Sequence, residues 1–289
     1  MDLSSTELTE RTLHGWPISY RVVGNGRRKI LFFHGFPGSS VQVDLFRKHC
    51  PEFDLQVLCL DRPGYNGTEA RGGDHFDETC QVVERVLQEL EWSEFEIFAV
   101  SGGTPFAFSC LQRVPEKVQR LTILCGLGPV TRDEFQGSFS KKSIFLLRLL
   151  PLLPGTILKR FLEKVANAQG EKRPPFFDWL MPTSKADQNS LRGAEMKSAL
   201  RLGLLEAVRQ DSRGPLLDAA AFVKPWPAER GSYQGPISLW HGEEDRMIPT
   251  AVAKVMQKRL DPCSLHLVPG EGHYSLPLRK MGQILRETL

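Results

Sequence analysis

The chain has 289 residues, of which 41% are hydrophobic and 25% charged, a composition that excludes collagen-like, coiled-coil and largely disordered chains. Its 37 basic residues nearly balance 34 acidic ones, so the net charge of +3 does not favour a nucleic-acid-binding protein. A chain of this length buries a sizeable core and forms one or two domains.

The predicted elements begin with an antiparallel hairpin and continue with buried strands. Residues 12–13 and 18–23 flank Gly15 and are expected to pair at the edge of a sheet. Short apolar runs follow, each closed by polar or glycine residues, and runs of this kind predict strands buried on both faces. These runs are residues 29–33, 55–60, 95–100, 121–125, 237–240 and 265–268.

Helical patterns separate several of these strands. Residues 77–90 place Cys80 and Val83 on one apolar stripe, with charged residues mostly opposite. Residues 250–260 and 278–289 are also expected to be helices. Strands that alternate with helices predict an α/β fold, with a mostly parallel sheet and helices on both faces.

One stretch, residues 131–233, breaks this alternation because it contains no convincing strand. Helical patterns occur there instead, at residues 143–150, 156–168 and 185–209. We therefore expect a helical cap at residues 131–233, inserted into a core that is formed by residues 1–130 and 234–289.

The most hydrophobic part of the expected cap is residues 144–165. Packing of cap helices on the core is one interpretation, and a lining for an acyl chain or another apolar substrate is a second. Docking to a membrane surface is a third, because basic residues flank the segment. The basic residues are Lys141, Lys142, Arg148, Lys159, Arg160 and Lys164. The aromatic residues Phe176, Phe177 and Trp179 could extend the same apolar wall.

Cysteine usage and the N-terminal segment favour a cytoplasmic protein. The six cysteines are scattered without C-x-x-C, and zinc-finger and H-E-x-x-H spacings do not occur, so we expect reduced thiols and no metal site. Residues 1–11 lack the apolar core of a signal peptide. The longest apolar stretch, residues 144–153, is too short to span a bilayer, so no stable membrane insertion is expected.

Ser101 is the candidate nucleophile. It follows the apolar run 95–100, lies in the sequence A-V-S-G-G and precedes an expected helix. A small-x-Ser-x-small sequence between a strand and a helix is typical of the nucleophile elbow, in which a tight turn exposes the hydroxyl. The N–H of Gly102 would then point toward a developing oxyanion at the positive end of that helix. A glycine-rich helix entry with a capping serine is the alternative.

A serine hydroxyl needs a base that is held by an acid. Of the seven histidines, His273 is the best candidate for the base, since the sequence G-E-G-H after the last strand can bring its imidazole to Ser101. Asp245, in H-G-E-E-D after the penultimate strand, can accept the other imidazole N–H and hold the correct tautomer. His34 and His241 precede glycines at strand ends and are expected to shape turns.

The sequence H-G-F-P-G follows the first long strand. Phe36 could donate its backbone N–H there as a second oxyanion-hole group beside Gly102. A glycine-rich turn without a chemical role is the alternative.

Together these segments resemble the α/β-hydrolase superfamily, in particular its capped, esterase-like branch. The chain order serine, aspartate, histidine is the order of that superfamily. The resemblance covers the core, roughly residues 12–130 and 234–289. The matching segments are residues 34–38, 61–65 (D-R-P-G-Y), 101–105, 241–245 and 270–273. Two positions depart from the usual pattern, Ala99 where glycine is common and Asn66 within G-Y-N-G.

The resemblance implies a role for each candidate residue. Ser101 would be the nucleophile, Asp245 the acid and His273 the base, with Phe36 and Gly102 as the oxyanion donors. It implies neither a metal nor an organic cofactor. A serine at the elbow disfavours the relatives that use an aspartate nucleophile, such as epoxide hydrolases.

The expected function is a serine hydrolase that cleaves a small or medium carboxylic ester, a lactone or a thioester through an acyl-enzyme on Ser101. Its expected partner is a small-molecule substrate with an apolar acyl or leaving group. A C–C bond hydrolase with the same triad is one alternative. A non-catalytic receptor or interaction protein on a hydrolase scaffold is another, because some hormone-receptor relatives keep an intact triad.

Overall fold

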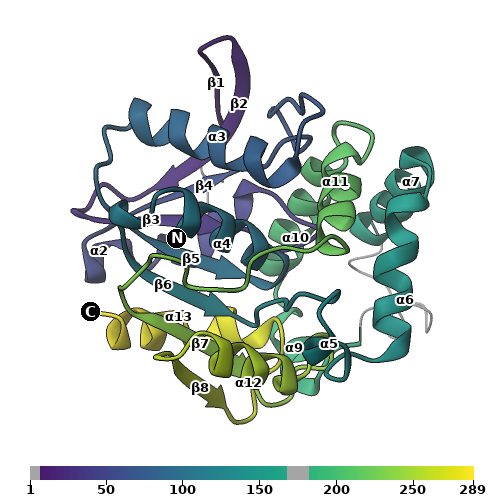
Figure 1. Ribbon diagram of the computed structural model, residues 1–289. Coiled ribbons are helices and arrows are strands. Elements are labelled where there is room, and N and C mark those ends of the chain that lie inside the picture. The colour runs from purple at the N-terminus through teal and green to yellow at the C-terminus, as the bar shows by residue number, and fades with distance from the viewer. Residues whose placement is uncertain (1–6, 168–181) are drawn as a thin grey trace.

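The computed structural model describes residues 7–167 and 182–289, and its centre is an eight-stranded sheet (Figure 1). The strand order is β1-β2-β4-β3-β5-β6-β7-β8, in which the hairpin β1–β2 joins β4 antiparallel and the remaining pairs are parallel. This confirms the predicted α/β fold and its edge hairpin. The strands are β1 (Thr9–Leu13), β2 (Trp16–Val23), β3 (Arg28–Phe33), β4 (Leu55–Leu60), β5 (Phe95–Val100), β6 (Val118–Leu124), β7 (Ile237–Gly242) and β8 (Ser264–Val268).

The helices outside residues 131–233 include the four that the sequence predicts. These are α3 (His75–Glu89), α4 (Thr104–Arg113), which follows Ser101, α12 (Thr250–Arg259) and α13 (Ser275–Glu287), and α13 begins three residues before the predicted start at residue 278. The others in this part of the chain are the α-helices α1 (Asp44–Arg47) and α2 (Cys50–Phe53) and the short 3₁₀ helices η1 (Ser40–Val43), η2 (Ser101–Gly103) and η3 (Pro115–Lys117).

Alternate residues of the central strands face two hydrophobic clusters, one on each side of the sheet. Leu31 and Ile97 belong to the cluster that includes side chains of α3, α4 and α12. Phe32 and Phe98 belong to the cluster that includes side chains of α2 and α13. Burial on both faces is the reason that these strands are continuous apolar runs.

The last strand, β8, does not fit the prediction of a strand buried on both faces. Its residues are exposed or half-buried, because β8 is the edge of the sheet and pairs only with β7. An edge strand has a neighbour on one side only, so fewer helices cover it.

Between β6 and β7 the described residues form helices and no strand. We call residues 131–233 the insertion. Its helices are α5 (Asp133–Gln136), α6 (Lys141–Leu149), η4 (Leu150–Leu152), α7 (Gly155–Asn167), α9 (Lys185–Ser190), α10 (Ala194–Ala207) and α11 (Arg213–Phe222). Figure 1 shows α6 and α7 at the outer side of the insertion, with α10 and α11 between them and the sheet.

Two features of the insertion differ from the sequence prediction. The single helix predicted at residues 185–209 is wrong, because the chain turns at residues 191–193 and α10 starts anew with Gly193 as its N-cap. Helix α11 is not predicted at all. Pro215 lies in the first turn of α11, where a proline costs no intrahelical hydrogen bond.

The apolar segment at residues 144–165 is only partly buried. Leu158 and Leu162 of α7 pack against Val208, as expected for helices that pack on their neighbours. Four other large apolar side chains are exposed: Phe145, Leu149, Leu152 and Ile157. Phe176, Phe177 and Trp179 lie outside the described residues. Within residues 7–167 and 182–289, no helix is long and apolar enough to cross a membrane.

Candidate active site

Ser101 lies on a strained turn between β5 and α4. Its φ of 52° falls in the left-handed region, which residues other than glycine rarely adopt. A Cβ at Gly103 would lie 2.4 Å from the carbonyl oxygen of Phe33, so the turn packs directly on β3. The hydroxyl of Thr104 donates to the carbonyl oxygen of Ser101 at 2.7 Å. The turn therefore has the geometry expected of a nucleophile elbow, and it places Ser101 at the carboxyl end of a central strand.

The structure brings the predicted nucleophile, acid and base together from three different strand ends. Nε2 of His273 lies 3.0 Å from Oγ of Ser101, and Nδ1 of His273 lies 2.7 Å from Oδ2 of Asp245. Asp245 and His273 are buried, and Ser101 is half-buried. When Nδ1–H donates to the carboxylate, the lone pair of Nε2 faces the serine hydroxyl. This arrangement can move the hydroxyl proton to the imidazole.

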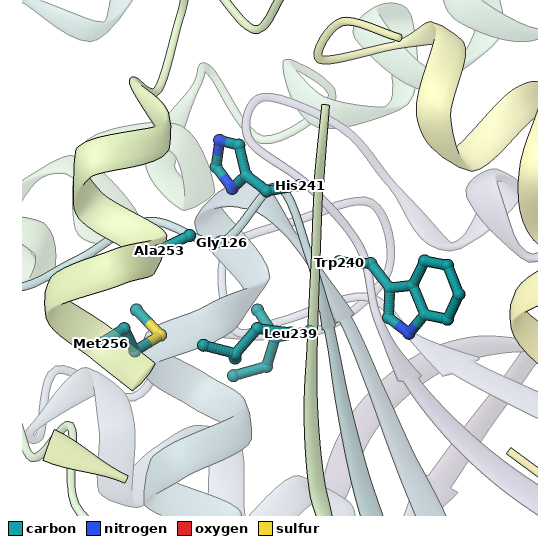
Figure 2. Close-up of a pocket in the computed structure, with 7 residues that line it drawn as sticks. Gly126, Leu239, Trp240, His241, Ala253 and Met256 are labelled. Carbon is teal, nitrogen blue, oxygen red and sulfur yellow. The ribbon is translucent and has the colours of Figure 1, made fainter. Parts of the chain in front are cut away.

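Asp245 is oriented by its own turn and by His241. Oδ1 of Asp245 accepts the N–H groups of Met247 and Ile248, both at 2.9 Å. Nε2 of His241 lies 3.4 Å from Oδ2 of Asp245 and 2.8 Å from the carbonyl oxygen of Ile248. Figure 2 shows a narrow gap between β7 and α12, with His241 on the α12 side of the strand and Trp240 on the opposite side. His241 thus shapes the turn that carries the acid, as predicted.

The charges of Asp245 and His273 support each other. Burial alone would raise the pKa of Asp245, but His273 and the hydrogen bonds from His241 and His273 hold this pKa well below its usual range. Burial alone would lower the pKa of His273, but Asp245, and Asp187 to a smaller extent, raise this pKa above the usual histidine value. Asp245 is therefore ionised at neutral pH, and His273 is a stronger base than free imidazole.

Phe36 and Gly102 lie side by side, where the sequence places the oxyanion hole. A Cβ at Gly102 would lie 2.6 Å from Cβ and 3.4 Å from N of Phe36. The N–H of Gly35 donates to Oε1 of Gln42 at 2.8 Å, which holds the turn that carries Phe36. Phe222 of α11 packs edge-to-face on Phe36, with ring centroids 5.2 Å apart. The insertion therefore contributes an aromatic side chain next to the elbow.

His34 is held neutral beside this turn. Burial, and secondly the Arg62 cation, lower the pKa of His34 to about 3. Its Nδ1 lies 2.9 Å from the carbonyl oxygen of Gly35, and its ring packs edge-on against Tyr65 at a centroid distance of 5.2 Å. His34 therefore shapes the turn after β3, which is the role that the sequence predicts.

Cys125, at the end of β6, lies next to the acid and the base. Among residues 7–167 and 182–289, one group of potential metal ligands was found, formed by Cys125, Asp245 and His273, with ligand atoms within 4.8 Å of one another. Asp245 and His273 already share a direct hydrogen bond, so an ion could bind there only by breaking it. Burial raises the pKa of Cys125 well above its usual value, so the thiol is protonated and a poor nucleophile. All six cysteines are free, as expected.

A buried ionic cluster that links the insertion to the core is missed by the sequence analysis. Oδ2 of Asp218 in α11 accepts from Nη2 of Arg62 at 2.5 Å and from the hydroxyl of Tyr65 at 2.6 Å, and Oδ1 lies 2.7 Å from Nε2 of His75. Nη1 of Arg62 also donates to the carbonyl oxygen of His34 at 2.8 Å. The only local signal is the motif D-R-P-G-Y, whose arginine is 156 residues from its aspartate partner.

Comparison with known proteins identifies the family. A family model described as "alpha/beta hydrolase fold" matches residues 29–279, which is most of the chain. The chain therefore belongs to the α/β-hydrolase family, and the predicted superfamily is confirmed. This membership supports hydrolase activity on a small-molecule substrate.

Individual relatives are distant. An esterase (EaEST) from Exiguobacterium antarcticum is 16% identical, with a TM-score of 0.71 over 97% of both chains. A bromoperoxidase from Bacillus anthracis is 15% identical, with a TM-score of 0.74 over 97% of this chain and 99% of that one. The epoxide hydrolase VrEH1 from Vigna radiata is 13% identical, with a TM-score of 0.73 over 99% of both chains. Similarity at this level establishes the fold and not the reaction.

A curated relative matches only part of the chain. YcgS of Bacillus subtilis (strain 168), described as an uncharacterized hydrolase, is 27% identical over 112 residues. The match covers 39% of this chain and 39% of YcgS.

Proposed function

We propose that the protein is a serine hydrolase that cleaves a small or medium carboxylic ester through an acyl-enzyme on Ser101. The observation that carries this proposal is the chain of contacts from Ser101 Oγ to His273 Nε2, 3.0 Å, and from His273 Nδ1 to Asp245 Oδ2, 2.7 Å. The proposed nucleophile thus contacts the proposed base, and the base contacts the proposed acid, which is the arrangement that double displacement requires. A lactone or a thioester would react by the same steps.

In the proposed mechanism, His273 accepts the hydroxyl proton while Oγ of Ser101 attacks the acyl carbonyl carbon. The backbone N–H groups of Phe36 and Gly102 stabilise the oxyanion that forms. The bond to the leaving group then breaks, and His273 returns the proton to the departing oxygen. A water molecule, deprotonated by His273, hydrolyses the acyl-enzyme and releases the carboxylic acid and free Ser101.

A serine at the elbow supports acyl transfer rather than epoxide or haloalkane opening. Attack on an alkyl carbon would leave Ser101 as an alkyl ether, which water does not cleave under mild conditions. A carboxylate nucleophile would leave an ester, which the same water could hydrolyse. The chemistry of the intermediate therefore supports a carbonyl substrate.

Labelling with a fluorophosphonate probe tests the proposal directly. The wild-type protein is expected to be labelled covalently, and Ser101→Ala is expected to lose labelling and ester turnover together. Ser109→Ala, on the helix that follows the elbow, is the matched control and is expected to keep both, since Ser109 donates to the carbonyl oxygen of Pro105, one turn earlier in that helix. Absence of labelling that depends on Ser101 would refute the enzyme proposal and favour a receptor or interaction protein.

The pH dependence of kcat/KM is expected to reflect His273. The base must be neutral to accept a proton, so activity rises as the pH rises through the pKa of His273. Because Asp245 raises this pKa, the acidic limb is expected above the ordinary histidine value of about 6.5. A profile measured between about pH 5 and pH 9 would contradict this assignment if its acidic midpoint lay below that of free histidine.

We further propose that the insertion, residues 131–233, is a cap that sets the substrate preference of a catalytic core formed by residues 1–130 and 234–289. The contact of Phe222 with Phe36 beside the elbow supports a preference for an apolar acyl or leaving group. Turnover of p-nitrophenyl esters of increasing acyl length measures that preference. Labelling of Ser101 without turnover of any ester would favour the C–C bond hydrolase instead.

A further inference from the structure

A buried carboxylate of the insertion, Asp187 in α9, contacts the loop that carries His273. Oδ1 of Asp187 accepts the backbone N–H groups of Tyr274 and Ser275, both at 2.8 Å. Oδ2 accepts the backbone N–H groups of Ser184 at 3.1 Å and His273 at 3.3 Å. Four backbone donors therefore converge on one fully buried side chain. Hydrogen bonds to an ionised carboxylate are stronger than those between neutral groups.

One carboxylate thus caps two helices. His273, Tyr274 and Ser275 lie at the start of α13, where backbone N–H groups have no intrahelical partner. Asp187 satisfies them from a position 86 to 88 residues earlier in the chain. The same side chain forms a capping box with Ser184 at the start of α9. The insertion and the loop of the base are therefore joined through a single group.

Gly272 makes this close approach possible. A Cβ there would lie 2.3 Å from Oδ2 of Asp187 and 2.4 Å from Oγ of Ser184, so any side chain would separate α9 from the loop. The loop is also held from the core, since the N–H of Glu244, in the turn after β7, donates to the carbonyl oxygen of Glu271 at 2.9 Å. The backbone next to His273 is therefore clamped between the core and the insertion.

We propose that Asp187 is a positioning residue for the reaction, which holds the backbone of His273 so that the imidazole spans Ser101 and Asp245. This rests on the proposed function, because it takes His273 as the base. A small displacement of a reacting group is enough to slow catalysis strongly.

The charges around His273 make the role measurable. Several elements place polar or titratable groups next to His273 or Asp245. Two carboxylates, Asp245 after β7 and Asp187 of α9, contact His273 directly, and so does the hydroxyl of Ser101 after β5. The others are Cys125 after β6, His241 of β7, and Glu271 of the His273 loop, which pairs with Arg279 and Lys280. Asp245 and Asp187 both raise the pKa of His273. Removal of the Asp187 charge therefore lowers this pKa and moves the acidic limb of the activity profile to lower pH.

The test is Asp187→Asn in the full chain, compared with the wild type in an ester assay between about pH 5 and pH 9. Asparagine keeps the size of the side chain but removes the charge and turns an NH₂ group toward backbone donors. We expect kcat to fall about tenfold to a hundredfold with a much smaller change in KM, and the acidic limb to move to lower pH. Ser184→Ala is the control, because it removes the other half of the capping box and leaves the carboxylate, so its acidic limb is expected to stay in place.

Fluorophosphonate labelling of Ser101 counts the active sites in each preparation, so that kcat refers to folded enzyme. Unchanged kcat and an unmoved limb in Asp187→Asn would overturn the positioning role. A lower rate that is explained entirely by fewer labelled sites, with kcat per labelled site unchanged and the limb unmoved, would overturn it too. If Asp187→Asn does not fold, Gly272→Ala is measured in the same assay, because the added Cβ would displace the Asp187 carboxylate. A wild-type kcat for Gly272→Ala would overturn the proposal. A wild-type protein that is not labelled overturns the proposed function, and the positioning role with it.

Discussion

Replacement of Asp245 by asparagine is expected to lower kcat by about 10⁴-fold while the fold is retained. Oδ1 of Asp245 accepts two backbone N–H groups, from Met247 and Ile248, so the amide oxygen of an asparagine would stay at that position. Its NH₂ group would then take the place of Oδ2 and donate to Nδ1 of His273. The imidazole proton would move to Nε2, and His273 could no longer accept the proton of Ser101.

Glu244→Gln is the matched control for Asp245→Asn, because Glu244 lies on the same turn and is exposed. It removes the same charge and is expected to leave kcat unchanged. Steady-state turnover of one p-nitrophenyl ester by both variants measures the difference. A kcat for Asp245→Asn within about tenfold of the wild-type value would show that another group orients His273.

Asp218→Asn is expected to lower the free energy of unfolding by about 3 kcal/mol, because it leaves the Arg62 cation buried without a counter-charge. Arg62 is only 1% exposed, and its other contacts, with the carbonyl oxygen of His34 and the rings of Tyr65 and Phe106, supply no counter-charge. Although burial opposes ionisation, Arg62 and His75 hold the pKa of Asp218 well below its usual range, so the carboxylate is charged at neutral pH. Urea denaturation at about pH 7 measures the change.

An exposed ion pair of the insertion provides the comparison for Asp218→Asn. Asp211 pairs with Lys159 at 2.8 Å, but the Asp211 side chain is 74% exposed. Asp211→Asn is therefore expected to cost less than about 1 kcal/mol, since water solvates both partners when the pair is lost. Equal effects of the two substitutions would contradict the importance that we assign to burial of the Asp218 cluster.

The positions of the three candidate side chains could be predicted from sequence because each follows a recognisable strand. Ser101 directly follows β5, and Asp245 and His273 lie in the turns after β7 and β8. Parallel strands present their carboxyl ends at the same edge of a sheet, so residues far apart in the chain meet there. The small residues around Ser101 added a steric signal, which the positive φ of Ser101 and the packing of Gly103 on β3 explain.

The contacts made by the insertion could not be predicted in this way. Asp187, Asp218 and Phe222 lie in helices that carry no motif, and α11 itself is not apparent from its pattern. The turn between α9 and α10 was also missed, since the helical pattern at residues 185–209 continues across it. Which face of such a helix meets the core depends on how several elements pack at once.

The succession of strands and helices along the chain and the turn at Ser101 follow from local sequence, because hydrophobic periodicity and turn residues act over a few neighbouring positions. The order of the strands in the sheet, in which β4 lies between β2 and β3, is seen only in the structure. The contacts of Asp187 with the His273 loop and of Asp218 with Arg62 are determined only by folding, because the partners lie 86 to 156 residues away. A buried carboxylate is stable only where donors converge on it, and convergence over that distance is a property of the packed molecule. The insertion is therefore joined to the His273 loop and to Arg62 of the core by contacts that no local sequence pattern predicts.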